Sequence, residues 1–318
     1  MVNIRKCAVI GCGNVGATTA YTLMLSGLFS EILLIDADAR RAAGEAEDLR
    51  QGLPFHSPVE IRAGEYRELA DAAVVIITAG APQRPGETRM DLLQKNVKIF
   101  SSVLGCLGRV PFEGILLVVT NPVDVLTYVT LSLSHLPPER VIGSGTVLDT
   151  ARLKQLVGNR LGVDSRNVHT FILGEHGDSE VAVWSSANVS GVDLSRFCGE
   201  CASACDTHAL RSMFEDVRDA AYRIIEAKGA TYYAIAEAVR RIVSAIVRDE
   251  HTILPVSALV DGHYGLSDVC MGIPCILGKN GIEQVLEIPL DAEEEHRLRS
   301  SAAALHSVIA SLGLEAGK

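Results

Sequence analysis

The chain has 318 residues, 48% hydrophobic and 21% charged, and its 39 acidic and 29 basic side chains give a formal net charge of −10. This composition is typical of a globular protein and excludes an intrinsically disordered chain. An acidic surface repels phosphate backbones, so we expect no nucleic-acid partner. No apolar run approaches the roughly 20 residues of a membrane-spanning helix, and we see no signal peptide. Eight cysteines make no disulfide scaffold at this length, so we expect reduced thiols in a cytoplasmic protein.

The first half of the sequence alternates short apolar runs with longer helical stretches. The predicted strands are residues 6–10, 31–35, 73–78, 115–120 and 140–142, and the predicted helices are 15–26, 40–51, 92–107 and 123–133. Consecutive apolar positions are typical of parallel strands that are buried on both faces. The alternation therefore predicts an α/β fold with a Rossmann-type doubly wound parallel sheet.

The rhythm changes from about residue 143. Helices are predicted over 148–161, over 208–248 with a break near Gly229, and from about Asp291 to about 312; strand-like runs are 168–173, 181–184, 252–260, 269–277 and 281–288. Asp291 is a good N-cap for the last helix. We predict two domains, residues 1–143 with the parallel sheet and residues 144–318 as an α+β domain, with a cleft between them.

A glycine-rich turn follows the first predicted strand directly. Gly11, Gly13 and Gly16 form a G-x-G-x-x-G pattern with a strand before it and a helix after it. The first glycine permits the tight turn, the second lets the backbone approach a pyrophosphate, and the third lets helix and strand pack closely. The helix N-terminus, with Asn14 and Val15, offers amide groups and a positive dipole to the phosphates.

Polar residues mark the ends of the other predicted strands. Asp36 lies twenty residues after the last glycine, where a carboxylate accepts hydrogen bonds from ribose hydroxyls and repels a 2′-phosphate, which favours NAD over NADP. The alternative is a glycine turn with an unrelated surface aspartate. The next two strands end in Thr78-Ala79-Gly80 and in Asn121; ligands bind outside such ends, although Asn121 is also a typical turn residue before Pro122.

Three further segments carry candidate chemistry. Residues 82–89 are predicted to form a polar loop. It is interpreted either as a lid that places Arg89 against a substrate carbonyl or as a solvated surface loop. Asp149 and Arg152 share a helix face, either as a surface ion pair or as a carboxylate that orients a base beside a substrate-binding guanidinium. His176 lies between glycines at a predicted strand end, where its imidazole is available to exchange a proton near neutral pH.

These residues, in this order, resemble the lactate/malate dehydrogenase family over essentially the whole chain. The matching segments are residues 11–16, 36, 80–89, 120–122, 143–152, 174–179 and 228–233. The resemblance implies that His176 donates and accepts the proton, that Asp149 is its partner, that Arg152 anchors the substrate carboxylate, and that Arg89 polarises the carbonyl. Domain 1–143 would bind NAD, and domain 144–318 would bind the substrate.

The resemblance also implies the remaining contacts. Asn121 would contact the substrate carbonyl and the nicotinamide, Thr231 would line the substrate pocket, and Ile235 would pack beside the nicotinamide ring. The implied reaction is a reversible hydride transfer between L-lactate or pyruvate and NAD(H). An intact set of reactive residues argues against the non-enzymatic alternative, an NAD-binding redox sensor.

Gln83 is the expected selector of the substrate. In this family the residue three positions before the loop glycine, here Gly86, faces the variable end of the substrate. An arginine there would pair with the second carboxylate of oxaloacetate, whereas neutral Gln83 leaves that carboxylate without a counter-charge, at a cost of several kcal/mol. Lactate is therefore favoured over malate, although a shift of one residue would place Arg84 there instead. Other 2-hydroxy acids stay as alternatives.

The resemblance implies regulation as well. Many bacterial relatives are homotetramers that fructose 1,6-bisphosphate activates, and their phosphate-contacting positions correspond to Lys154 and His169. Lys154 departs from the usual arginine and loses its bidentate geometry. The alternative is a pair of ordinary surface residues.

Cys198, Cys201, Cys205 and His208 have a spacing that resembles a metal site. Four ligands along one helix cannot easily surround a tetrahedral ion, so we expect a thiol-rich helix face and no metal.

Overall fold

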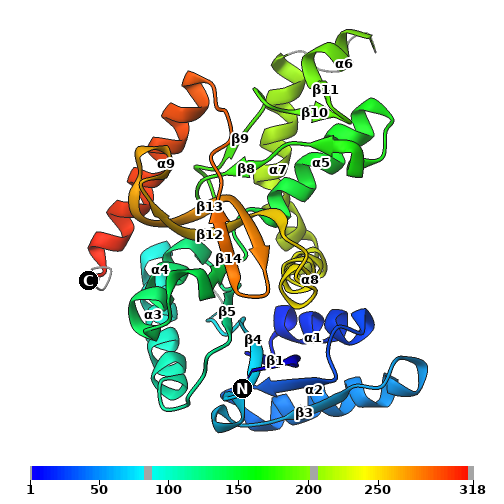
Figure 1. Cartoon of the computed structure of the whole chain (residues 1–318), viewed down its shortest axis with the longest axis vertical. Coiled ribbons are helices and arrows are strands. Elements are labelled where there is room, and N and C mark those ends of the chain that lie inside the picture. The colour runs from blue at the N-terminus through cyan, green and yellow to red at the C-terminus, as the bar shows by residue number, and fades with distance from the viewer. Residues whose placement is uncertain (1, 82–87, 201–206, 314–318) are drawn as a thin grey trace.

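The computed structural model describes residues 2–81, 88–200 and 207–313, shown as a ribbon in Figure 1. Its strands are β1 (Asn3–Ile10), β2 (Glu31–Ile35), β3 (Glu60–Ala63), β4 (Ala72–Ile77), β5 (Ile115–Val118), β6 (Val141–Gly143), β7 (Val168–His169), β8 (Ile172–Leu173), β9 (Val181–Ala182), β10 (Asn188–Val189), β11 (Val192–Asp193), β12 (Thr252–Asp261), β13 (Ser267–Gly278) and β14 (Gly281–Val285). Its helices are α1 (Asn14–Ser26), α2 (Ala39–Gly52), α3 (Arg89–Leu107), α4 (Val123–Ser134), α5 (Val147–Leu161), α6 (Leu194–Glu200), α7 (Thr207–Lys228), α8 (Tyr233–Val247) and α9 (Ala292–Ser311).

One nine-stranded sheet runs through both halves of the chain. Its order is β14-β13-β12-β6-β5-β4-β1-β2-β3, and the six strands from β6 to β3 are parallel. The parallel part confirms the doubly wound fold that the alternating pattern predicts. The antiparallel strands β12 to β14 continue this sheet, and β12 joins it where Ser257 pairs with Gly143.

The strands form because their residues are apolar on both faces. Every residue of β4 and β5 is buried, which matches parallel strands covered by helices on each side. The sequence pattern missed β3, an edge strand with only Ile61 buried. It also merged β7 and β8, because residues 168–173 read as one run.

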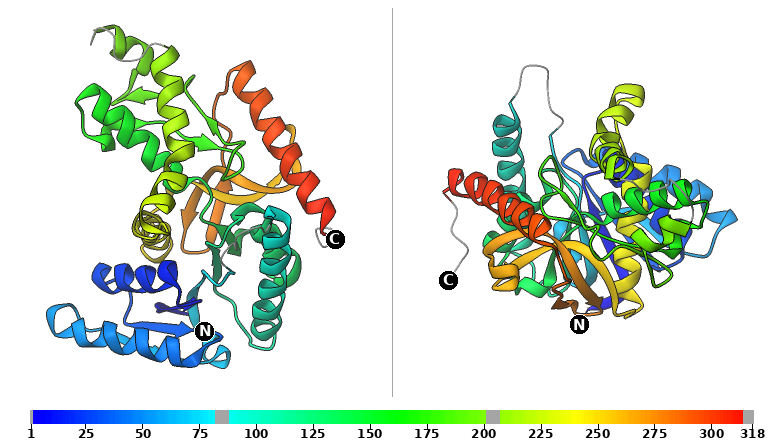
Figure 2. Two further views of the ribbon diagram at one scale, coloured as in Figure 1. Left: turned by 180° about the vertical axis from the view of Figure 1, so that it is seen from behind. Right: turned by 90° about the horizontal axis from the view of Figure 1, so that it is seen from above.

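Helices cover the two faces of the parallel strands. Figure 1 shows α1 and α8 on one side of these strands and α3 and α4 on the other. The contact of α1 with α8 brings the second half of the chain against the glycine-rich turn. The two views of Figure 2 show α9 alongside the outer end of the sheet, where it contacts α4 and β13.

Side-chain caps determine where several helices begin. Asp38 accepts hydrogen bonds from two amides at the start of α2, and Asp291 caps α9 as its position in the sequence predicts. Thr88 and Asp91 form a capping box, with Thr88 Oγ1 accepting from the Asp91 amide at 3.1 Å. This cap fixes Arg89 as the first residue of α3.

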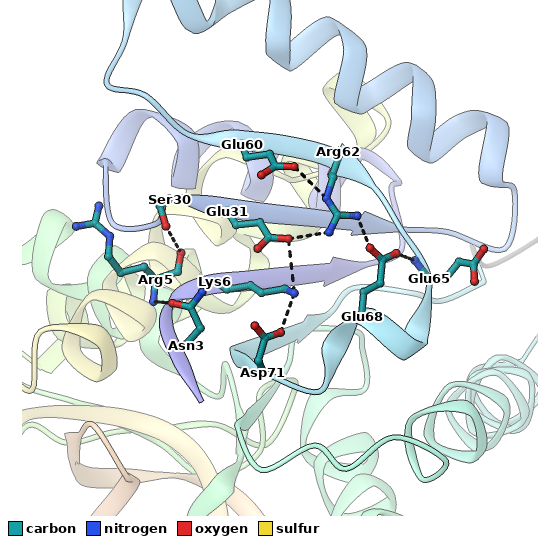
Figure 3. A network of polar contacts seen from close by, with 10 residues as sticks. All are labelled: Asn3, Arg5, Lys6, Ser30, Glu31, Glu60, Arg62, Glu65, Glu68 and Asp71. Carbon is teal, nitrogen blue, oxygen red and sulfur yellow. Dashed lines mark hydrogen bonds and ion pairs between the residues drawn. The ribbon is translucent and has the colours of Figure 1, made fainter. Parts of the chain in front are cut away.

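A charged network holds β1, β2 and β3 together on one face of the sheet (Figure 3). The Lys6 ammonium is buried and lies 2.7 Å from Asp71 and 3.6 Å from Glu31. Arg62 of β3 donates to the same Glu31 at 2.9 Å and to Glu68 at 2.5 Å. Since each cation faces more than one carboxylate, its charge is compensated although it is partly desolvated. The network therefore joins β1, β2 and β3.

The cysteines are mostly as the sequence predicts. Among the described residues, five are free, namely Cys7, Cys12, Cys106, Cys270 and Cys275. The expectation of reduced thiols is wrong for Cys198, which is disulfide-bonded. Cys201 and Cys205 lie outside the described residues, so the expected thiol-rich helix face is not tested there.

Among the described residues, no helix combines the length and apolar character needed to cross a membrane.

Candidate active site

The glycine-rich turn has the geometry of a dinucleotide cradle. Gly11 has φ +98°, and a Cβ there would lie 2.5 Å from the Ala79 amide nitrogen. A Cβ on Gly16 would lie 1.8 Å from the Gly11 carbonyl oxygen, so both positions require glycine. Gly13 is different, because a Cβ there would meet nothing within 4 Å. The backbone at Gly13 is therefore open for a ligand to approach.

The helix that follows this turn is free to bind an anion. Its N-cap is Gly13, no side chain caps it, and its first turn carries no acidic residue. A diphosphate there would receive amide hydrogen bonds without charge repulsion. The cradle therefore fits the pyrophosphate of a dinucleotide.

Asp36 is fixed at the end of β2. Its Oδ2 accepts from the Cys12 amide at 2.6 Å, and its Oδ1 accepts from the Asp38 amide at 2.9 Å. These two bonds hold the carboxylate beside the glycine-rich turn, and each oxygen keeps a lone pair for a further donor. A ribose next to the diphosphate is within the reach of such an acceptor.

Most of the predicted site residues line a single cavity of about 600 Å³. The predicted residues that line it are Gly13, Asn14, Val15, Thr78, Gly80, Asn121, Arg152, His176, Thr231 and Ile235. Gly11 and Gly16 belong to the turn behind it, and Ala79, after β4, lies against Gly11. Asp149 lies beneath the cavity with 2% of its surface exposed. Gln83 and the side chain of Arg89 lie outside the described residues.

Beneath the cavity, a buried carboxylate contacts two of the residues that line it. Asp149 Oδ2 lies 2.5 Å from His176 Nδ1, and Asp149 Oδ1 accepts from Arg152 Nη1 at 2.8 Å. The ion pair that the spacing on α5 predicts is therefore present, but it is buried instead of solvated. Because Nδ1 is engaged, Nε2 of His176 is the ring nitrogen available to a ligand.

The electrostatics favour a protonated imidazole. Burial lowers the pKa of His176, but Asp149 outweighs it, and with Asp124 and Glu180 the carboxylates raise this pKa to about 9. Burial likewise opposes ionisation of Asp149, but His176 and Arg152 hold its pKa below the ordinary value. The pair thus carries a proton at neutral pH.

The loop that carries His176 is held from three directions. Gly174 exchanges two backbone hydrogen bonds with Gly272 of β13, at 2.9 and 2.8 Å. The Glu175 amide donates to Ser301 Oγ of α9 at 2.8 Å. The His176 amide donates to Asp124 Oδ2 of α4 at 2.7 Å.

Asp124 is a positioning residue that the sequence reasoning missed. It is 1% exposed, and its second oxygen accepts from Ser257 Oγ of β12 at 2.6 Å. Burial raises its pKa to about 6, although the bonds from Ser257 and His176 favour the ionised form. One carboxylate thus joins α4, β12 and the His176 loop. In sequence it is only an acid in the first turn of a predicted helix, so no signal pointed to it.

Asn96 of α3 was also missed. It is 1% exposed, its Nδ2 donates to the Asn121 carbonyl at 2.8 Å, and its Oδ1 accepts from the Ala81 amide at 2.9 Å. One amide side chain thus holds the ends of two strands at the cavity. Arg41, Ala221 and Ile225 line the same cavity and were not singled out either.

A second cavity brings together the two expected phosphate contacts. Lys154 and His169 both line a hollow of about 820 Å³, together with Arg240 and Arg241. Lys154 is half-buried, and burial lowers its pKa. Glu237 also lines the cavity and pairs with Arg240 at 2.7 Å, and Arg241 pairs with Glu250 at 2.6 Å, so carboxylates compensate part of this positive charge.

A His-carboxylate cluster lies outside both cavities. Among the described residues, Asp249, His251 and Glu283 form the group whose ligand atoms lie within 4.8 Å of one another. His251 directs Nδ1 to Glu283 at 2.6 Å and Nε2 to Asp249 at 3.5 Å, and Lys279 Nζ lies 3.3 Å from Asp249. Because the two ring nitrogens face different carboxylates, this is an arrangement of ion pairs and not a set of ligands that converge on one ion.

The fold and the cavity define a dinucleotide-binding protein with a buried imidazole–carboxylate pair and a guanidinium at the cofactor site. Residues 5–143 match the family of the lactate/malate dehydrogenase NAD binding domain, and residues 146–314 match the lactate/malate dehydrogenase alpha/beta C-terminal domain. The chain therefore belongs to the lactate/malate dehydrogenase family. Its cofactor is NAD, which the open cradle at Gly13 fits.

Named relatives align over nearly the full chain. The L-lactate dehydrogenase of Acetivibrio thermocellus is 54% identical over 98% of both chains, and L-lactate dehydrogenase 1 of Clostridium acetobutylicum is 48% identical over 96% of this chain and 98% of its own. A ligand-bound minor L-lactate dehydrogenase of Enterococcus mundtii superposes with a TM-score of 0.94 at 39% identity, covering 97% of this chain and 98% of that one. A lactate dehydrogenase from a deep-sea metagenome superposes with a TM-score of 0.95 at 43% identity, covering 98% of this chain and 100% of that one.

Replacing Asp124 tests how the His176 loop is held. Asp124→Ala leaves the His176 amide and the Ser257 hydroxyl buried without an acceptor, so the free energy of unfolding should fall by about 2–4 kcal/mol. A displaced imidazole should also lower kcat by at least about tenfold. Ser257→Ala, which removes one of the two bonds, should cost less stability and leave kcat near wild type. Denaturant unfolding and steady-state kinetics measure both, and an Asp124→Ala variant with unchanged kcat would contradict the positioning role.

Proposed function

We propose that this protein is an NAD-dependent L-lactate dehydrogenase, which interconverts L-lactate plus NAD with pyruvate plus NADH and a proton. The observation that carries the proposal is the contact of Asp149 with both His176 and Arg152, in the cavity that contains the glycine-rich turn. A small 2-keto acid needs a proton donor for its carbonyl and a cation for its carboxylate. The lactate dehydrogenases at 48–54% identity support the same activity.

His176 and Asp149 handle the proton. When bound, NADH supplies the hydride and NAD accepts it. For pyruvate reduction the protonated imidazole donates from Nε2 to the carbonyl oxygen, while Asp149 holds Nδ1 and stabilises the positive charge before the transfer. For lactate oxidation the neutral imidazole accepts the hydroxyl proton. The contact with Asp149 fixes which ring nitrogen faces the substrate.

The other residues bind and orient the substrate. Arg152 donates to Asp149 through Nη1, and its other N–H groups would donate to the substrate carboxylate. Asn121, Thr231 and Ile235 line the cavity and would surround the carbonyl, the methyl group and the nicotinamide ring. Arg89, at the start of α3, would polarise the carbonyl.

The proposal extends to the organisation of the chain. Residues 1–143 would be the NAD-binding domain and residues 144–318 the substrate domain, which is supported by family matches that end at 143 and begin at 146. Asp36 would bind the adenosine ribose, and Gly11 to Gly16 and Thr78 to Gly80 would surround the diphosphate. We also propose a cytoplasmic homotetramer.

The choice of substrate is tested by exchanging the selector. The wild-type enzyme should oxidise NADH faster with pyruvate than with oxaloacetate or 2-oxoisocaproate, because Gln83 offers no counter-charge to a second carboxylate. Gln83→Arg should raise the ratio of kcat/KM for oxaloacetate to that for pyruvate by at least about a hundredfold. Arg84→Gln, one position along, is the matched control and should leave the ratio unchanged. A preference of the wild type for oxaloacetate would favour malate dehydrogenase, and binding of NADH without turnover would favour a redox sensor.

We further propose that the cavity of Lys154 and His169 binds fructose 1,6-bisphosphate. Three cationic side chains, Lys154, Arg240 and Arg241, line it against one carboxylate, Glu237, which suits a ligand that carries phosphate groups. The effector should then lower the KM for pyruvate in the wild type and have at least about tenfold weaker potency with Lys154→Ala. Lys98→Ala, which removes an exposed lysine of α3, should respond like the wild type. A titration of effector against KM decides this, and an unresponsive wild type would remove the proposal.

A further inference from the structure

Glu180 is a buried carboxyl group beside the acid–base pair that the proposed mechanism does not use. It follows His176 by four residues, and its amide donates to the Gly177 carbonyl at 3.3 Å, which closes the turn before β9. The residue is 6% exposed, and within the described part of the chain its Oε1 is buried without a hydrogen-bond partner. A buried carboxylate oxygen without a hydrogen-bond donor destabilises the ionised form strongly, whereas it destabilises the neutral carboxyl group much less.

The charges around Glu180 belong mostly to the active site. Asp149 and Arg152 face it from α5, His176 from its own loop, and Arg218 from α7. Its neighbour β8, formed by Ile172 and Leu173, carries no charge.

Helix α9 packs against β9, and none of the main groups that shift the pKa of Glu180 lies on this helix. Its buried Glu294 accepts from the amides of Trp184 and Ser185, at 2.7 and 2.9 Å, beyond the other end of the strand. His176 also faces Asp124 of α4.

The neighbouring charges shift the pKa of Glu180 in opposite directions. Burial is the main cause that raises the pKa of Glu180, and the Asp149 carboxylate adds to it, against the three cations. Glu180 in turn is one of the carboxylates that raise the pKa of His176. The protonation of the two side chains is therefore linked.

The substrate brings a further carboxylate into this cluster of charged side chains. In the proposed reaction both pyruvate and lactate place a carboxylate on Arg152, which already contacts Asp149. An ionised Glu180 would bring a further buried negative charge next to the same guanidinium, while a protonated Glu180 would not. We propose that Glu180 is a second proton-binding residue of this active site, and that the 2-keto or 2-hydroxy acid anion binds to the form in which Glu180 is protonated. This inference rests on the proposed function.

The two reaction directions separate Glu180 from His176. Lactate oxidation needs neutral His176, so its kcat/KM rises with pH as the imidazole deprotonates. If substrate binding needs protonated Glu180, the same quantity falls about tenfold per pH unit once Glu180 ionises. The wild-type profile for lactate is therefore bell-shaped. For pyruvate reduction both ionisations act in the same direction, so the alkaline fall approaches a hundredfold per pH unit.

Glu180→Gln keeps the shape of the side chain and cannot ionise. The lactate profile of this variant should rise to a plateau without an alkaline fall, and its pyruvate profile should fall tenfold per unit instead of a hundredfold. Glu180→Met, which has no side-chain oxygen that needs a partner and cannot ionise, should give the same profiles. Asp178→Asn makes the same charge change at an exposed position of the same loop and should keep the wild-type profile. Profiles that coincide between wild type and Glu180→Gln would overturn the inference, as would loss of the fall in Asp178→Asn.

Stability gives a readout that does not depend on turnover. A carboxyl group whose pKa is higher in the folded than in the unfolded protein loses its stabilising contribution as the pH rises through the folded pKa. The Tm of Glu180→Gln relative to wild type should therefore increase between the ordinary pKa of a glutamate and the folded value of about 8, and then level off. A difference that stays constant over this range would contradict a buried, titrating Glu180. Absence of wild-type turnover with both acids at every pH would overturn the proposed function and this inference together. Normal wild-type turnover with coinciding profiles would overturn this inference alone.

Discussion

The contact between Asp149 and His176 is the interaction on which the whole site depends. A carboxylate that is 2% exposed is costly unless its charge is compensated, and here one oxygen contacts the imidazole and the other the guanidinium of Arg152. The same contact raises the pKa of His176 and fixes the nitrogen that faces the cavity. Burial, proton affinity and orientation therefore have a common cause. Without this carboxylate the cavity would still bind a dinucleotide but would lack a positioned acid.

The fold brings this pair to the cofactor by joining the two halves of the chain at several points. The strands β12 to β14 extend the parallel sheet, α8 packs on α1, and Asp124 connects α4, β12 and the His176 loop. Each of these contacts crosses between residues far apart in sequence. The cleft between the two halves is thus built on a continuous sheet, which keeps the glycine-rich turn and the imidazole in a fixed relation.

The sequence predicted those parts of the fold whose signals are local. Apolar runs predicted β2, β4 and β5 closely, and the glycine pattern predicted the turn, because steric demands at Gly11 and Gly16 act over a few residues. The edge strand β3 has one buried residue and gave no apolar run. The extension of the sheet by β12 to β14 depends on pairing with a strand more than a hundred residues away, which no local pattern encodes.

The site divides in the same way. Asp149, Arg152 and His176 were candidates because their types and positions have chemical meaning in the sequence alone. Asp124, Asn96 and Glu180 were not, because a buried carboxyl or amide is distinguished only by what surrounds it after folding. Of the two explanations for Asp149 and Arg152, the surface ion pair is wrong because the pair is buried, and the active-site role stays a prediction.

The most direct test of the central claim is the pH dependence of lactate oxidation by the wild type and by Asp149→Asn. The acid side of this profile reports the lower of the two proton losses, from His176 and from Glu180, and Asp149 raises the pKa of both side chains. Removing the carboxylate removes the main cause that raises the pKa of His176, so the midpoint should move to lower pH by roughly 1–3 units. A midpoint that stays in place, or moves to higher pH, would contradict the account.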